Sequence, residues 1–438
     1  MNELEKFLES VSGEGESGEF AIDRESAVAK ISAHQIPYGG HWALKIIQAA
    51  VALGCTAIEV LQTRHKTVFL IAGTEGWDSD YIAERFWDIE PSRDRSLDHL
   101  KTALWRVGIH EKRSFELRLP GSRHSLAWNG ESLSNQSVTS CGPEVRLEVF
   151  HQPVDSEDGW WARTRNARCI NATVGAILAK RAFVCPVPLS LDGRRIDYLF
   201  ERGHPGLGPS SLPVGFTFLR EGEPKFRLDA LGNRPREWWD RSTLGRLSEE
   251  KLEKIEIPGE DIWMAAIVVL HIGHRVISKT SYLTCRAGQS LCQWVIDGVV
   301  TERVVFLERS TPLSINCFVS GAGLATDMTT MSFHQNQEFK DRFRKVVQET
   351  KKILQSDWSI DLDPLADKER RRHQTEAVVF GMSGLILLPL PPLAFLVWWA
   401  ARRDFRLSQE TSEGAIEEAL AGLQTLREEW AKLAAEWG

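Results

Sequence analysis

The chain has 438 residues, enough for two or three domains, and 42% of them are hydrophobic, which permits a large core. The formal net charge is −7, so we expect no nucleic-acid partner, because proteins bind nucleic-acid phosphates through a basic surface. Seven scattered cysteines without a CxxC pair indicate reduced, buried thiols rather than a zinc site.

The amino end is acidic and polar. Residues 1–25 hold eight acidic side chains against two basic ones and no apolar core, so we expect no signal peptide and a cytoplasmic folded part. The stretch SGEGESGE favours flexibility, and residues 1–19 are therefore expected to form a flexible acidic terminus.

Residues 20–150 predict a first α+β domain, with helices on one face of a mixed sheet. Apolar residues spaced three and four apart indicate its helices, and alternating apolar and polar residues indicate its strands. The expected helices cover 24–34, 41–53, 78–88 and 94–107, and the expected strands cover 57–60, 66–72, 113–119, 123–128 and 144–150.

After a connection at 151–161, residues 160–356 predict a second α/β domain. Its first part contains a helix at 165–181 and a strand–turn–strand at 185–197, with Asp192-Gly193 at the turn. A loop rich in glycine and proline follows. The loop covers 203–215, the later strands 262–270, 292–297, 302–307 and 313–319, and the closing helix 337–354.

One apolar segment changes the expected class of the protein. Residues 377–401 run for twenty-five positions without a charge, and a helix of that length could cross a hydrocarbon core of roughly 30 Å. Basic residues on both sides leave the orientation open, and three prolines near its middle would break or kink a helix. We expect a transmembrane or re-entrant segment that holds cytoplasmic domains at the membrane; a buried hydrophobic hairpin is the soluble alternative.

Residues 412–437 predict an amphipathic helix at the carboxyl end. The spacing of its large apolar residues by three and four makes one stripe that needs a surface to cover it. We favour self-association or a partner helix over docking within the chain or on the membrane interface. The stripe consists of Leu423, Leu426, Trp430, Leu433 and Trp437.

Several short motifs point to chemistry but have simpler interpretations. HIGH at 271–274 matches a nucleotide-binding signature of class I aminoacyl-tRNA synthetases, yet here it ends an apolar strand instead of opening a helix. As a metal site the two histidines lack a third ligand at usable spacing. The glycine loops at 206–208 and 320–323 have no following helix cap or lysine, so a phosphate loop is not indicated.

A polar residue in the helix at 41–53 is the most informative feature. Gln48 lies among Ile46, Ile47, Ala49 and Ala50, on a helix that otherwise reads as core. The stretch IIQAAVALGCTAIEV resembles the first ATP-site helix of the GHKL superfamily, which includes gyrase, heat-shock chaperones, histidine kinases and MutL. Members carry Glu-x-x-x-Asn-Ala-x-x-Ala, then a turn and a strand.

The resemblance implies roles for individual positions. Gln48 falls on the asparagine that binds the magnesium of the nucleotide, and Ala49 and Ala52 fall on the two alanines. Leu44 falls on the glutamate that activates water, and it cannot accept a proton, so no catalytic residue is implied. Gly76 is the glycine retained from the family's Asp-x-Gly-x-Gly motif.

Other parts of the family pattern are altered. Ala72 stands where the family's aspartate accepts the adenine amino group, and Thr74 replaces the first glycine of that motif. The strand at 142–150 resembles the later Gly-Thr strand with Pro143 in place of threonine, and no glycine-rich lid is recognisable at 88–110.

The resemblance implies a GHKL-like (Bergerat) α/β sandwich followed by a ribosomal-S5-like domain, together α+β. With the base, the adenine acceptor and the lid all lost, we predict a membrane-tethered pseudo-ATPase that acts as a binding or signalling scaffold through an unknown protein partner or a second copy. The alternative is a weak ATP-binding switch or slow ATPase. We therefore expect either no cofactor or ATP with magnesium held by Gln48.

Overall fold

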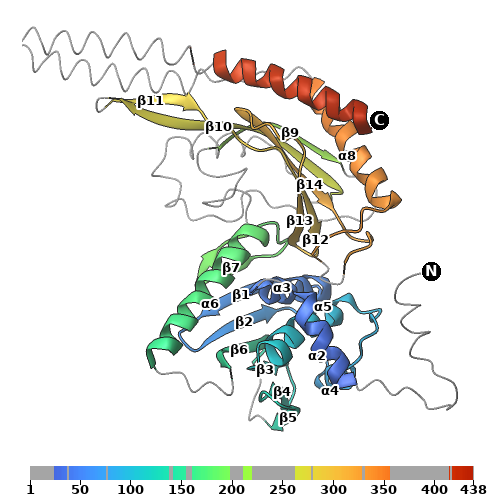
Figure 1. Cartoon of the computed structure of the whole chain (residues 1–438). Coiled ribbons are helices and arrows are strands. Elements are labelled where there is room, and N and C mark those ends of the chain that lie inside the picture. Colours follow the sequence, from blue (N-terminus) through green and yellow to red (C-terminus); the bar gives the residue numbers. More distant parts are fainter. Residues whose placement is uncertain are drawn as a thin grey trace, which may run out of the picture.

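The computed structural model describes residues 24–36, 39–74, 77–137, 142–153, 160–197, 211–219, 262–277, 280–327, 331–355, 414 and 417–437. Over these residues the chain is a mixed α+β protein with two sheets, each covered by its own helices (Figure 1). Predicted segments 1–19 and 377–401 lie outside the described residues. Within the described residues, no helix has the length and apolar character needed to cross a membrane.

The first sheet has eight strands in the order β5-β4-β3-β6-β2-β1-β7-β8. All of its pairs are antiparallel except β1 with β7. Its strands are β1 (Ala57–Gln62), β2 (Lys66–Ala72), β3 (Arg113–Arg118), β4 (His124–Trp128), β5 (Leu133–Ser137), β6 (Val145–Pro153), β7 (Leu189–Leu191) and β8 (Arg194–Arg195).

Helices cover one face of this sheet, and α3 is the central one. Gly40 and Gly54 flank α3 in the left-handed region, with φ of 87° and 86°, and the Gly54 N–H donates to Val51 to close the last turn. Every residue from 41 to 50 is buried, as expected for a helix enclosed on all sides. The helices are α2 (Arg24–Gln35), α3 (His41–Leu53), α4 (Ser79–Arg85), α5 (Arg95–Leu104), the π-helix η1 (Trp105–His110) and α6 (Trp160–Arg181).

The boundary between the domains lies later than the sequence predicted. Residues 160–197 were expected to belong to the second domain, but β7 joins the first sheet beside β1, and Val174, Leu178 and Leu189 are buried in the first core. Parallel strands need a crossover connection, and α6 precedes β7 in the position to provide it. The first domain therefore extends to residue 197.

The second sheet has the order β11-β10-β14-β12-β13, and β9 pairs with β10. The predicted loop at 203–215 is partly wrong, because β9 begins at Ser211; residues 203–210 lie outside the described part of the chain. The remaining elements are β9 (Ser211–Leu219), β10 (Met264–Ile277), β11 (Thr280–Cys285), β12 (Leu291–Ile296), β13 (Val299–Val305), β14 (Leu313–Ser320) and α8 (Gln337–Gln355).

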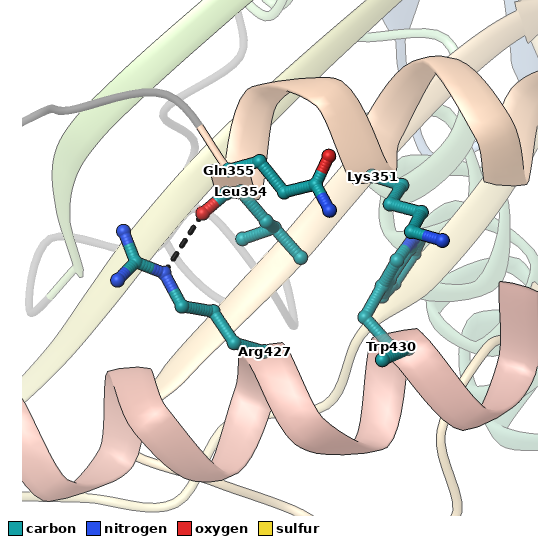
Figure 2. Close-up of a pocket in the computed structure, with 6 residues that line it drawn as sticks. Lys351, Leu354, Gln355, Arg427 and Trp430 are labelled. Carbon is teal, nitrogen blue, oxygen red and sulfur yellow. Dashed lines mark hydrogen bonds between the residues drawn. The ribbon is translucent and has the colours of Figure 1, made fainter.

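The C-terminal helix, residues 417–437, lies along α8 (Figures 1 and 2). Its apolar stripe packs into the core of the second domain, where Leu426 and Trp430 are 0% and 1% exposed. The Arg427 Nε donates to the Leu354 carbonyl at 2.8 Å, and the Trp430 indole N–H donates to Val347 at 3.1 Å. Docking within the chain therefore covers this stripe, in place of the self-association or partner helix that the sequence favours.

Candidate functional site

The polar residues of α3 share one side of the helix. His41, Lys45 and Gln48 follow the spacing i, i+4, i+7, which places them one above another. They are buried, with exposed fractions of 7%, 0% and 0%. Because buried polar groups are costly unless they find partners, this face must be matched by polar groups from another element.

The turn between β12 and β13 covers this face. Asp297 and Gly298 form the turn with φ of 45° and 75°, the positive values that Asp-Gly hairpin turns require. A side chain at Gly298 would meet Pro186 Cδ at 2.8 Å and Val51 Cγ2 at 3.2 Å. The absence of a side chain lets the second domain press its turn against α3.

Gln48 joins the two domains. Its Nε2 donates to the Ile296 carbonyl of β12 at 3.1 Å, across 248 residues of chain. Its Oε1, the atom that the resemblance would place on magnesium, is buried without a hydrogen-bond donor among the described residues. The amide therefore serves the contact between domains, and the carbonyl oxygen has spare acceptor capacity.

Asp297 brings basic residues of the first domain together. Arg95 Nη2 lies 3.0 Å from one carboxylate oxygen, and His99 Nε2 lies 3.1 Å from the other. Lys45 is fully buried, and this burial lowers its pKa to about 7 although Asp297 and Asp327 attract its charge. Burial also lowers the pKa of His99, with a further lowering from Lys45. The cluster of Lys45, Arg95, His99 and Asp297 is hereafter called the interdomain cluster.

The position of the family's catalytic base is closed. Leu44 is 0% exposed and belongs to the first apolar core, so the position is closed to solvent and apolar. Ala49 is likewise fully buried and Ala52 is half-buried. Gly76 lies outside the described residues.

Ala72 lies on the other face of the sheet from Gln48. Along β2, Ile71 is buried in the core that contains α3, and alternation turns Ala72 to the opposite face. There it lines a cleft of about 350 Å³ with Glu59, Glu144 and Arg195 among its other walls. The nucleotide-binding positions implied by the resemblance are therefore not gathered into one site, and these residues do not fit ATP with magnesium in this arrangement.

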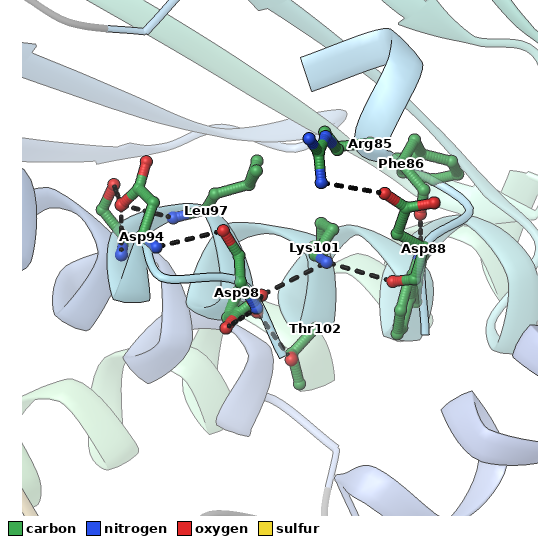
Figure 3. Close-up of polar contacts among 11 residues, drawn as sticks. Arg85, Phe86, Asp88, Asp94, Leu97, Asp98, Lys101 and Thr102 are labelled. Carbon is green, nitrogen blue, oxygen red and sulfur yellow. Dashed lines mark hydrogen bonds and ion pairs between the residues drawn. The ribbon is translucent and has the colours of Figure 1, made fainter. Parts of the chain in front are cut away.

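No long glycine-rich lid follows α4. The connection to α5 is a short loop held by side chains of α5 (Figure 3). Lys101 Nζ donates to the Asp88 carbonyl at 3.0 Å, Asp98 accepts the Ser92 N–H at 2.8 Å, and Asp94 caps α5 by accepting the N–H of Ser96 at 2.9 Å. The region at 88–110 is thus a fixed loop followed by helix.

The HIGH motif has a structural role at His271. Its Nε2 lies 2.6 Å from Ser314 Oγ inside the second domain, and burial lowers its pKa to about 4, which keeps the ring neutral. No group of three or more histidine, cysteine or acidic side chains suited to a metal occurs among the residues that the structure describes.

The sequence predicted the helices that carry Lys45, Arg95 and His99, but it singled out none of the four residues of the interdomain cluster. Lys45 was detectable as a charged residue one turn before Gln48 on an apolar helix. Asp297-Gly298 was detectable as a hairpin turn. Arg95 and His99 carry no local signal, because many surface helices have such residues.

No known family model matches the sequence, and no curated protein is similar to it. Solved structures similar to this chain include the B-subunit of DNA gyrase from Myxococcus xanthus, at 10% identity and a TM-score of 0.36, covering 76% of this chain and 96% of that one. The N-terminal domain of a DNA repair protein is similar at 9% identity and a TM-score of 0.34; the match covers 75% of this chain and 98% of that one. The MutL ATPase domain of Aquifex aeolicus, complexed with ADP, is similar at 10% identity and a TM-score of 0.29; the match covers 63% of this chain and 90% of that one. Gyrase and MutL, the GHKL members named from the sequence, are thus among its structural neighbours, at TM-scores too low to transfer any chemistry.

Proposed function

We propose that this chain is a binding or signalling scaffold built on a GHKL-like fold followed by an S5-like domain, and that it does not hydrolyse ATP. One observation carries the proposal: the Gln48 amide, at the position of the family's magnesium ligand, donates to Ile296 of the chain's own second domain. The face that would meet a nucleotide is used to hold two domains together.

The missing groups act on different steps of an ATPase cycle. Loss of a general base typically costs about 10²–10⁴-fold in rate, and Leu44 supplies none. Loss of a charged hydrogen bond to adenine costs roughly 1.5–3 kcal/mol, about one to two decades in affinity, and Ala72 cannot make that bond. Both affinity and turnover are therefore expected to be poor.

The direct test is ATP turnover by the purified full chain in mild detergent. We expect no phosphate release above the buffer background, with or without magnesium. Gln48→Ala is compared with Gln62→Ala, because Gln62 also donates its amide to a backbone carbonyl, that of Asn171 at 3.1 Å. Steady turnover that Gln48→Ala abolishes and Gln62→Ala retains would show that the protein is an ATPase.

A second candidate is a nucleotide-gated switch that binds ATP weakly. It is favoured by Gln48 Oε1, which finds no donor in the described part of the chain and has the chemistry of a magnesium ligand. In this case magnesium-dependent ATP binding accompanies separation of the β12–β13 turn from α3. Titration calorimetry with and without magnesium distinguishes the switch from the scaffold.

We further propose that the scaffold is held at the membrane through residues 377–401 and acts there on a protein partner. The uncharged length of this segment supports the proposal. The full chain should sediment with membranes and resist a high-salt wash, whereas deletion of residues 377–401 should release it. Recovery of the full chain in the supernatant without detergent would contradict the tether.

A further inference from the structure

The C-terminal helix runs antiparallel to α8. Three hydrogen bonds join the two helices, and their order gives the direction: as the residue number falls along α8, the number of the partner rises along the C-terminal helix. The bonds run from Arg427 Nε to the Leu354 carbonyl at 2.8 Å, from the Trp430 indole N–H to the Val347 carbonyl at 3.1 Å, and from Arg344 Nε to the Trp437 carbonyl at 2.6 Å. The end of α8 and the beginning of the C-terminal helix therefore lie at the same end of the pair.

The C-terminal helix is part of the core of the second domain. Ala419, Leu426 and Trp430 belong to that core and are 0%, 0% and 1% exposed. Near the beginning of the helix, a side chain at Gly422 would meet Pro312 Cδ at 3.0 Å, so the backbone lies close to the loop before β14. The helix is thus packed from its first turns onward, and undocking it would expose apolar surface to water.

This packing constrains where the chain between the two helices can go. Residues 356–416 leave one domain at α8 and return to the same domain at the C-terminal helix. A single membrane crossing by residues 377–401 would carry the C-terminal helix to the opposite side from α8 and remove it from the core. Two full crossings need about 40 apolar residues, roughly 20 for each, and the uncharged segment has twenty-five.

We propose that α8, the C-terminal helix and the two domains lie on one side of the membrane, and that residues 377–401 are a one-sided lipid anchor whose two flanks stay on that side. The inference rests on the proposed membrane tether and adds its sidedness. Of the two forms of membrane segment that the sequence leaves open, it selects the re-entrant one.

The charges beside the segment agree with this placement. Residues 368–373 and 401–406 are both rich in arginine and lysine. Basic residues are enriched on the cytoplasmic side of membrane segments, so two basic flanks are expected when both flanks stay on that side. Pro389, Pro391 and Pro392 lie near the middle of the segment, where a chain that returns to its starting side must turn.

Cysteine labelling in sealed membrane vesicles tests the sidedness. Thr375→Cys and Ser408→Cys each place a thiol on one flank of the segment, and the natural Cys169, exposed on α6, marks the side of the first domain. Vesicles of both orientations receive an impermeant maleimide, and each variant of the full chain is compared with the unsubstituted chain. We expect both variants to gain one label in the orientation in which Cys169 reacts. Labelling of the two flanks from opposite sides would overturn the proposal.

Pro391→Cys separates a one-sided anchor from a segment that passes through the membrane or stays outside it. We expect this thiol to react from neither side of intact vesicles and to react after detergent is added. Labelling from the side opposite to Cys169 would show that the segment reaches the other face. Labelling from the side of Cys169 would show that the segment lies outside the bilayer. Either result would overturn the proposal.

Sedimentation distinguishes failure of this inference from failure of the tether. A full chain that stays in the supernatant would refute the tether and the one-sided anchor together. A full chain that sediments with membranes but has its flanks on opposite sides would leave the tether in place and refute only the one-sided anchor.

Discussion

Trp430→Ala should lower the free energy of unfolding of the second domain by about 3–5 kcal/mol, the usual cost of removing a buried tryptophan. Trp430 is 1% exposed, its ring centroid lies 4.8 Å from that of Phe306, and its indole N–H donates to Val347. The substitution leaves a cavity between α8 and the C-terminal helix and removes the hydrogen bond that joins the two helices at Val347. Denaturant unfolding followed by circular dichroism measures the change.

Trp161→Ala is the matched control, because the Trp161 side chain is 78% exposed. Its free energy of unfolding should stay within about 0.5 kcal/mol of the wild type. Light scattering of Trp430→Ala should show an unchanged mass, since the apolar stripe is already covered within the chain. A reduced mass together with unchanged stability would instead identify the stripe as an interface between copies.

Leu44→Glu should destabilise the first domain by about 3–5 kcal/mol and produce no ATP turnover. The side chain is fully buried in an apolar core, so a carboxylate there is an uncompensated buried charge or must take up a proton. Restoring the family's base does not restore its surroundings, because Ala72 faces away and the β12–β13 turn covers Gln48. Thermal unfolding and a phosphate-release assay measure the two effects.

Leu44→Met is the control for Leu44→Glu, since a volume-conserving apolar change usually costs less than about 1.5 kcal/mol. If Leu44→Glu folds with wild-type stability and hydrolyses ATP, then α3 opens to solvent in a way that the buried position of Leu44 does not allow, and the scaffold proposal is wrong.

Local pattern determined most elements of this protein. The helix at 41–53 was predictable because its apolar spacing is helical and Gly54 ends it in the left-handed region. The turns at Asp192-Gly193 and Asp297-Gly298 both show the positive φ that their residue types favour. The strand β5 lies at a sheet edge and has exposed polar residues at 135–137. Its sequence therefore shows little alternation of apolar and polar residues, and the pattern does not predict it.

The sequence by itself also determined the losses at the family's positions, since Leu44 and Ala72 lack the required chemistry in any fold. Only the tertiary structure decided what surrounds them. Periodicity tells which side of an element is apolar, but not which distant segment covers it. The covering of Gln48 by residues 296–298, the place of β7 beside β1 and the docking of the C-terminal helix on α8 all join segments far apart in the chain. The interdomain cluster exists for the same reason: charges 198 and 202 residues apart become partners only when two domains meet.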